Sequence, residues 1–325
     1  MLIDDRLYGE ADVEPVLSDL IRSEAVQRLK GVHQGGASFL VHPGWNITRF
    51  EHSLGVMLLI RQLGGSLEEQ IAGLLHDVSH TAFSHVVDDV FNIENEDYHE
   101  QIFATWVSHS AIPEILHTYG FNHEELLDDD RKWTLLERPA PALCVDRIDY
   151  TLRDSFAYGF ANKDEIATFL QTGLTVFAGE ICCTSIEAAE WFTDLYYKEV
   201  IGFFMNPLNL YGLDTVSSVL KQALEMELIS VQDVLKTDDE LLAVLKQDSR
   251  LHSQLDRLTT AKQHVKQGNP DDFTFHKTLK TRNIDPSVIH QGDKTPASAL
   301  SENVRRMKER AADKMKKGAF VKVTE

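Results

Sequence analysis

The sequence of 325 residues contains few cysteines and no long apolar segment. Its three cysteines are Cys144, Cys182 and Cys183, so they cannot all pair, and no CxxC pair suggests structural zinc. No stretch approaches the roughly 20 apolar residues of a membrane helix, and the first residues do not have the pattern of a secretory signal. We therefore expect a reduced, cytoplasmic protein without a membrane span.

Basic residues are also scarce. The chain has 32 Lys and Arg against 51 Asp and Glu, which gives a formal net charge of -19. This balance argues against broad nucleic-acid binding, because such binding needs basic surface to neutralise phosphates. Residues 301–325 differ from the rest, with eight basic and four acidic residues. We interpret their periodic part, 302–317, as a solvated basic helix, and docking on an acidic neighbour is the alternative.

The residues that are present have mostly helical periodicity, with a hydrophobic fraction of 43%. Residues 48–51 (TRFE) and 66–69 (SLEE) have the pattern of a capping box, which predicts that a helix begins at each. Two short apolar runs on either side of Ala178-Gly179-Glu180 predict a β-hairpin. We therefore expect an all-α fold with one small hairpin near 174–183.

The domain organisation follows from where this periodicity weakens. We expect one domain of residues 1–228, which includes the hairpin and the long helix after it. Residues 229–325 would form a helical C-terminal region that ends in the basic helix. No internal repeat is visible.

Two adjacent polar residues, His76 and Asp77, interrupt an apolar helical pattern. A single internal histidine is most often structural, because it can fill many hydrogen-bond roles. A divalent ion at a catalytic site is bound by neutral imidazoles and carboxylates, with positions left open for water and substrate. With His52 and Asp146, which lie on two other predicted helices, the pair would supply two ligands of each kind.

The predicted helix 143–158 carries a polar stripe. Its polar residues recur at i, i+3, i+4, i+7 and i+8, so they share one face. They are Asp146, Asp149, Tyr150, Arg153 and Asp154. Such a stripe inside a globular chain either faces water or lines a site.

Three motif blocks occur in a specific order: 49–56 (RFEHSLGV), 76–85 (HDVSHTAFSH) and 145–150 (VDRIDY). They resemble the HD-domain phosphohydrolases, and more narrowly the branch that contains the deoxynucleoside triphosphate triphosphohydrolases. The order H…HD…D is the metal signature of that family. The resemblance is good over about residues 1–160 and fades after about 205.

The resemblance implies that His52, His76, Asp77 and Asp146 bind one divalent metal ion. The ion could be Mn, Fe, Mg, Zn, Ni or Co, because relative affinity does not identify the native metal. A second ion could bind together with substrate. The metal would activate a water for in-line attack on a phosphorus atom.

The resemblance also implies a catalytic group beside the metal, made of His99, His80 and Asp88. His99 would act as general acid or base, held by Asp88 or Glu100. The alternative is that His99 is exposed at the start of a helix. His85 is open between a supporting and a structural role.

Six further positions are predicted to bind substrate. Arg49 could hold a phosphate oxygen, although it could equally form a surface ion pair. The resemblance implies that Arg147 and Tyr150 contact phosphate and sugar, that Asp154 contacts the sugar 3′-hydroxyl and that Gln34 contacts the deoxyribose edge. Lys198 would help to neutralise phosphate charge.

The long helix after the hairpin departs from the family pattern, because Lys198 is its only cation within residues 191–205. Fewer cations favour smaller phosphates unless metal ions make up the difference. We expect a deoxynucleoside triphosphate triphosphohydrolase. A phosphomonoesterase or nucleotidase acting on a smaller ester, and a non-catalytic nucleotide-sensing module, are the alternatives. We also expect a small-molecule phosphate substrate and a homo-oligomer, dimer or higher.

Overall fold

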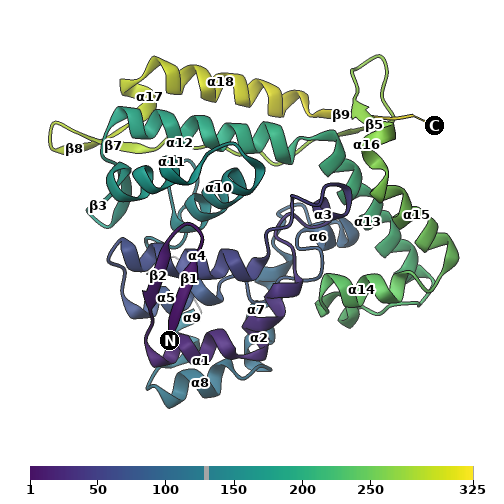
Figure 1. The fold of residues 1–325 in the computed structure, drawn as a ribbon, viewed down its shortest axis with the longest axis horizontal. Coiled ribbons are helices and arrows are strands. Elements are labelled where there is room, and N and C mark those ends of the chain that lie inside the picture. Colours follow the sequence, from purple (N-terminus) through teal and green to yellow (C-terminus); the bar gives the residue numbers. More distant parts are fainter. Residues whose placement is uncertain (128–131, 325) are drawn as a thin grey trace.

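A computed structural model describes residues 1–127 and 132–324, and helices dominate it (Figure 1). The helices of the N-terminal half are α1 (Pro15–Arg22), α2 (Glu24–Arg28), α3 (Ser38–Val41), α4 (Arg49–Gln62), α5 (Leu67–Leu75), α6 (Val86–Phe91), α7 (Tyr98–Ser108), α8 (Ile112–Thr118), α9 (His123–Leu127) and α10 (Val145–Tyr158). Those that follow are α11 (Lys163–Thr168), α12 (Ile186–Glu199), α13 (Pro207–Glu225), α14 (Asp238–Leu245), α15 (Ser249–Thr259), α16 (Ala261–His264), α17 (Ala297–Leu300) and α18 (Glu302–Lys317).

The fold contains more sheet than the one hairpin that we predicted. The predicted hairpin is confirmed as β3 (Leu174–Phe177) and β4 (Glu180–Cys183), joined by a turn with positive φ at Ala178 and Gly179. Two antiparallel strands, β1 (Leu2–Asp5) and β2 (Gly9–Asp12), open the chain. The remaining strands are β5 (Val265–Gln267), β6 (Phe275–Lys277), β7 (Ser287–His290), β8 (Asp293–Pro296) and β9 (Ala319–Val323).

The sheets were missed because their strands are short and pair across long sequence separations. Strand β7 pairs in parallel with β4, which extends the hairpin to the order β3-β4-β7-β8. Strand β9 lies between β5 and β6 in a second, antiparallel sheet. Three or four residues are too few to show the alternation that identifies a strand.

Both predicted helix starts near the site are confirmed. Thr48 and Glu51 form a reciprocal capping box at the start of α4. Ser66 caps α5, but the carboxylate of Glu69 accepts hydrogen bonds from the backbone N–H groups of Leu135 and Leu136 instead of completing the box. The start of α5 therefore also ties down the chain ahead of α10.

The C-terminal region packs against the helices that precede it. In Figure 1, α18 runs alongside α12, and the two helices are in contact. Helix α13 contacts α6 and α15, which joins the two sides of the molecule. The chain between β6 and β7 passes from one sheet to the other, and this return brings residues near 280 to the cleft described below.

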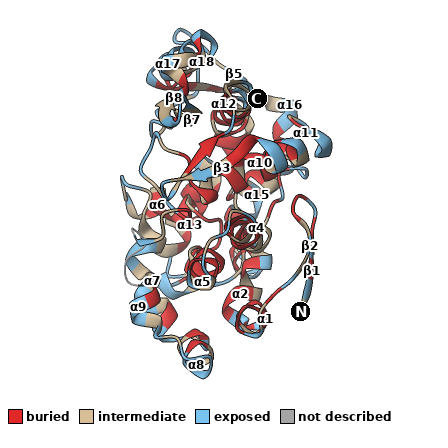
Figure 2. Ribbon diagram, turned by 90° about the vertical axis from the view of Figure 1, so that its left-hand side faces the viewer, coloured by how far each residue is buried: buried red, intermediate tan, exposed pale blue. Residues whose placement is uncertain are grey.

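The core is continuous through the helical layers, as the red interior in Figure 2 shows. Helices α4 and α5 are largely buried, with Val56, Met57, Ile71 and Leu74 fully shielded from solvent. Within the described residues, no helix is both long and apolar enough to cross a membrane.

Candidate metal centre and cleft

His52 lies inside the fold, on the face of α4 that meets α10. It is fully buried, and its Nδ1 lies 2.7 Å from a carboxylate oxygen of Asp149. Its Nε2 lies 3.0 Å from Oδ1 of Asp146. With Nδ1–H donated to Asp149, Nε2 is the nitrogen that would face a metal, which is how ligating histidines are usually oriented.

His76 and Asp77 lie at the end of α5 rather than within it. His76 is the C-cap residue, and Asp77 follows it in the turn of residues 76–79. The ring Nδ1 of His76 lies 2.7 Å from the carbonyl oxygen of Gly73, so this nitrogen carries a proton. His76 Nε2 therefore faces the cluster, and it is buried without a hydrogen-bond partner among the described residues.

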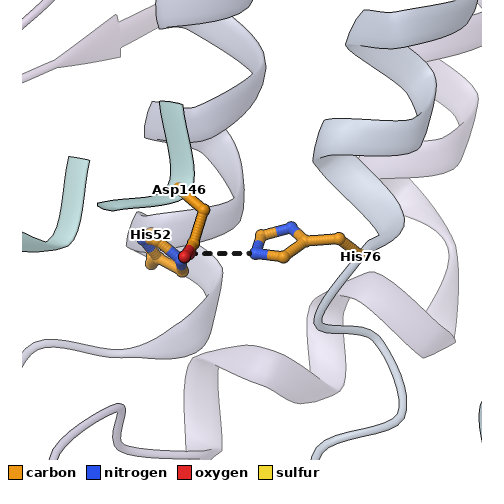
Figure 3. Close-up of side chains that lie close together, drawn as sticks. All are labelled: His52, His76 and Asp146. Atoms are coloured by element: carbon orange, nitrogen blue, oxygen red, sulfur yellow. Dashed lines mark hydrogen bonds and ion pairs between the residues drawn. The ribbon is translucent and has the colours of Figure 1, made fainter. Parts of the chain in front are cut away.

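The four predicted ligands converge. Figure 3 shows His76 reaching from its own chain segment toward Asp146 and His52. His76 Nε2 lies 3.6 Å from Oδ1 of Asp146 and 3.5 Å from Oδ1 of Asp77, and His52 Nε2 lies 3.6 Å from the other oxygen of Asp77. A single ion at the centre could contact side chains from three separate segments of the chain.

The donor set fits a divalent metal ion. Ligand atoms of His52, His76 and Asp146 all lie within 4.8 Å of one another, and Asp77 adjoins them. The buried, unpartnered Nε2 of His76 would be costly unless a cation or water satisfied it. Two imidazoles and two carboxylates suit several first-row metals, so the identity of the ion stays open.

The electrostatics of the cluster also favour positive charge. Although burial lowers the pKa of His52, its hydrogen bonds to Asp146 and Asp149 raise it to about 10. Burial raises the pKa of Asp146, but the hydrogen bond with His52 and the charges of His52 and His76 outweigh it and hold that pKa well below the usual range. The carboxylates thus attract positive charge to this point, and a divalent ion would supply it in place of protons.

A chain of ion pairs on α10 supports His52. Arg153 donates two hydrogen bonds to Asp149, at 2.9 and 3.1 Å, and its Nη1 lies 3.0 Å from Asp5 of the N-terminal strand. All three side chains are buried. The polar stripe that we predicted on this helix therefore lines a site rather than facing water.

Gly55 makes room for this support. A β-carbon at Gly55 would lie 2.0 Å from both Oδ1 of Asp149 and Nη2 of Arg153. Glycine three residues after His52 thus lets α10 approach α4 closely enough for His52 to reach Asp149.

A cluster of imidazoles adjoins the metal candidates. The rings of His80 and His99 stack with their centroids 3.8 Å apart, and His80 Nε2 lies 3.2 Å from Oδ1 of Asp77. Burial, followed by the charge of His85, lowers the pKa of His99 to about 3. His99 is therefore a neutral imidazole that is only partly exposed, and the alternative of a fully exposed histidine at a helix start is wrong.

We predicted that Asp88 or Glu100 holds His99, and the carboxylate of Asp88 contacts two neighbours of that ring. Its carboxylate accepts the backbone N–H of Tyr98 at 3.0 Å and lies 3.0 Å from Nδ1 of His85. The His85 ring is edge-on to those of His80 and His99. Asp88 therefore orients the histidine beside the stack, and it fixes the start of α7, which carries His99.

A cavity of about 300 Å³ opens onto these residues. His76, Asp77, His80, His99 and Asp146 line it, whereas His52 lies beneath them. The predicted substrate residues that also line it are Gln34, Arg49, Tyr150 and Asp154.

Arg49 is only partly free to bind a ligand. Its Nη1 lies 2.6 Å from Asp77 Oδ2, and its Nε donates to the hydroxyl of Ser84 at 3.1 Å. The ion pair is buried, so it differs from the surface pair that we considered. Burial raises the pKa of Asp77, but the Arg49 charge outweighs it and keeps this candidate ligand ionised.

Two predicted phosphate contacts do not reach the cavity. Lys198 is half-exposed on α12, where it pairs with Asp194 at 2.7 Å. Arg147 donates to the carbonyl oxygen of Ala142 at 2.6 Å, and it stabilises the chain that leads into α10. Neither side chain is part of the cavity lining.

Several residues of the site were not predicted. Asp149 and Arg153 were visible on the polar stripe, but the spacing alone gave them no role. Lys280 and Arg282 line the cavity from the chain between β6 and β7. No periodic pattern surrounds these two, so only the tertiary structure places them.

Comparison with known proteins agrees with this geometry. Residues 49–154 match the HD domain family. The chain is 53% identical to the uncharacterized protein YdhJ of Bacillus subtilis, over 99% of both chains. It is 31% identical to the metal-dependent phosphohydrolase cns2 of Cordyceps militaris, over 91% of this chain and 87% of that protein.

A more distant relative is the deoxynucleoside triphosphate triphosphohydrolase SAMHD1 of Homo sapiens, which is 28% identical over 52% of this chain and 35% of that protein. The HD match begins with α4 and extends to Asp154 on α10, so it contains all four predicted metal ligands. Because the similarity to cns2 also runs through nearly the whole chain, the protein belongs to the HD-domain family of metal-dependent phosphohydrolases.

Proposed function

We propose that this hydrolase cleaves a deoxynucleoside triphosphate at the α-phosphorus and releases the nucleoside and tripolyphosphate. The observation that carries the proposal is the composition of one cavity. Gln34, Tyr150 and Asp154, which match sugar-contacting positions of the triphosphohydrolase branch, line it together with His76 and Asp146. They come from separate parts of the chain, so their meeting at the metal candidates supports a nucleotide as ligand.

The residues would divide the work as follows. His52, His76, Asp77 and Asp146 would hold a divalent ion, which supplies a nucleophilic water near neutral pH and neutralises phosphoryl charge. Arg49, anchored by Asp77, would contact a phosphate oxygen. Water adds to phosphorus as the bond to the 5′-oxygen breaks, and that oxygen takes up a proton.

His99 is the candidate for carrying a proton from the attacking water to the 5′-oxygen. Its Nδ1 is buried and has no hydrogen-bond partner among the described residues, and its ring lines the cavity. A neutral imidazole can accept a proton from the attacking water, and His80, stacked against it, holds the ring in place.

A nucleotidase or other phosphomonoesterase is the second candidate, and the positions of two cations favour it. Lys198 lies outside the cavity, and Arg49 is already paired with Asp77. A triphosphate carries about four negative charges, so its binding would need positive charge from elsewhere.

The products separate the candidates. The full chain, loaded in turn with Mn²⁺, Fe²⁺, Mg²⁺, Zn²⁺, Ni²⁺ or Co²⁺, is screened against deoxynucleoside triphosphates, nucleoside monophosphates and simple phosphate esters. Tripolyphosphate with free nucleoside supports the first candidate. Orthophosphate from monophosphates supports the second, and absence of turnover on the whole panel supports a nucleotide-sensing module.

His76→Ala is the informative variant, because it removes a predicted ligand that lines the cavity and leaves the Arg49–Asp77 ion pair in place. We expect turnover to fall by at least about 100-fold, since loss of even an indirect metal contact commonly costs 10- to 100-fold. His117→Ala, which changes an exposed histidine on α8, is the matched control. Full activity of His76→Ala with normal folding would contradict the assigned metal site.

A further inference from the structure

Two cations reach the metal cavity from the C-terminal region of the chain. Lys280 and Arg282 lie between β6 and β7, and both side chains line the cavity that contains His76 and Asp146. Both also line an adjoining cavity of about 660 Å³. The two cations therefore stand where the two cavities meet, and a ligand held at the metal residues could extend past them.

Neighbouring carboxylates neutralise the charges of Lys280 and Arg282 less fully than that of Arg49. Arg282 Nη2 lies 3.6 Å from the carboxylate of Glu96, and both side chains are about one-third exposed. Within residues 1–127 and 132–324, no carboxylate lies within ion-pair distance of Lys280, whose ammonium donates to the carbonyl oxygen of Asn95 at 3.0 Å. Arg49, by contrast, forms a buried pair at 2.6 Å.

The segment that carries these cations is held in place. The Arg282 guanidinium lies 4.6 Å from the ring centroid of Phe204, which also lines both cavities. Two residues later, Ile284 is fully buried, and the hydroxyl of Tyr197 on α12 donates to the side chain of Asn283 at 3.1 Å. A ligand would therefore meet cations whose backbone is already positioned, which lowers the entropic cost of binding.

We propose that Lys280 and Arg282 bind the part of a substrate's phosphate chain that extends beyond the phosphorus at the metal residues, and that they set a preference for polyphosphates over monophosphates. This inference rests on the proposed function, because it requires a phosphorylated substrate. Arg282 would exchange Glu96 for phosphate, which offers it two parallel charge-assisted hydrogen bonds. The exchange costs little, since a solvent-accessible pair at 3.6 Å is weak.

Lys280 and Arg282 bring to the cavity the positive charge that α12 does not provide. The helix after the hairpin contributes Lys198, which pairs with Asp194 outside the cavity. Lys280 and Arg282 come instead from a segment far beyond the HD match, which ends at residue 154, and the fold returns this segment to the cleft.

Tripolyphosphate and orthophosphate, titrated calorimetrically into the Mn²⁺-loaded full chain, test the proposal without requiring catalysis. We expect tripolyphosphate to bind more tightly than orthophosphate. Arg282→Gln and Lys280→Gln should each weaken tripolyphosphate binding about tenfold or more, as expected for a charge-assisted hydrogen bond, and change orthophosphate binding less than about threefold. Lys236→Gln, which removes an exposed cation paired with Asp233, should change neither.

Glu96→Gln provides a test in the opposite direction. It releases Arg282 from its acidic neighbour, so tripolyphosphate binding should tighten by about two- to fivefold. This variant keeps the proposal testable if Arg282→Gln does not fold. Weaker binding by Glu96→Gln would overturn the proposal, as would unchanged binding by both Arg282→Gln and Lys280→Gln, or failure of the unmodified protein to prefer tripolyphosphate.

The phosphate site and the proposed reaction can fail separately. The protein could bind tripolyphosphate tightly through Lys280 and Arg282 and yet hydrolyse no phosphate ester. That result would contradict the proposed reaction and support the phosphate site. If the protein hydrolyses nucleotides and the two substitutions have no effect, the proposed reaction is supported and the phosphate site is contradicted.

Discussion

Helix α10 carries two buried acidic groups that differ in how their charge is balanced. In the first, Asp149 is paired with Arg153 and hydrogen-bonded to His52, so the negative charge has cationic partners. In the second, Asp154 neighbours Glu199 of α12, and no basic side chain forms an ion pair with either one among the described residues. Both groups are almost completely shielded from solvent.

Because of this difference, the carboxyls of the two groups ionise at different pH. Burial raises the pKa of Asp154 to about 7. Burial, followed by the charge of Asp154, raises the pKa of Glu199 well above its usual range. The first group is therefore ionic and holds His52, a candidate metal ligand. The carboxyls of the second group keep their protons to higher pH, and Asp154 presents one of these carboxyls to the cavity.

The largest effect is expected from Asp149→Asn. The amide leaves buried Arg153 with less compensating charge and can turn an N–H toward Nδ1 of His52, so we expect a loss of about 3–5 kcal/mol in the free energy of unfolding. Activity should also fall by about 10- to 100-fold, because His52 loses its orientation. Urea unfolding and metal content measure the two effects. Unchanged stability would show that the ion-pair chain is not required.

Gly55→Ala disturbs the pair of Asp149 and Arg153 by adding volume rather than by removing charge. Its methyl group would come 2.0 Å from the Asp149 and Arg153 side chains, so α10 must move away from α4. We expect a loss of about 1–3 kcal/mol, typical of overpacking in a well-packed interior. Gly64→Ala is not a suitable control because of its positive φ, whereas Ser108→Ala changes an exposed helix position. Thermal unfolding of both variants decides whether the close approach matters.

The sequence was sufficient to predict the centre of the site but not its surroundings. His52, His76, Asp77 and Asp146 belong to motif blocks with fixed local patterns, and the fold brings them together. Asp149 lay on the predicted polar stripe, yet its contact with His52 depends on how α10 crosses α4, and the contact of Arg153 with Asp5 depends on where β1 lies. Burial, rather than spacing, gives such residues their role.

The remaining residues could not be predicted because the signal lies in tertiary packing. Glu199 is the last residue of α12, and nothing in its neighbours indicates that Asp154 lies beside it. Lys280 and Arg282 follow a short strand that pairs only with the end of the chain, in β9. Lys198 had the better sequence argument, yet the rotation of α12 turns it toward Asp194 and solvent.

The second acidic group should make stability depend on pH. Between the ordinary pKa of an aspartate, 3.8, and the raised value of about 7, the folded protein binds more protons at Asp154 than the unfolded chain does. The free energy of unfolding should therefore fall as pH rises through this window. Glu199→Gln removes the like-charged neighbour, so the fall from pH 5 to pH 8 should shrink by roughly 1–2 kcal/mol.

Urea unfolding at pH 5, 6, 7 and 8 measures this difference. Other buried acids with raised pKa values, such as Asp238, contribute equally to both proteins and cancel in the comparison. Parallel curves for the variant and the unmodified protein would mean that the two carboxyls do not share a proton-dependent interaction.

The smallest effect is expected from Asp154→Asn, the same chemical change as in Asp149→Asn but in the second group. At pH 6 Asp154 is mostly protonated, and an amide replaces a neutral acid with a similar donor and acceptor. The kcat/KM of the substrate found in the screen should change less than about threefold at pH 6. At pH 8 Asp154 of the unmodified protein is ionised, whereas the asparagine of the variant stays neutral. The ratio of the two kcat/KM values should therefore differ from that at pH 6. A loss of about 100-fold at pH 6 would show that the site uses the carboxylate, and the contrast between the two acidic groups would then disappear.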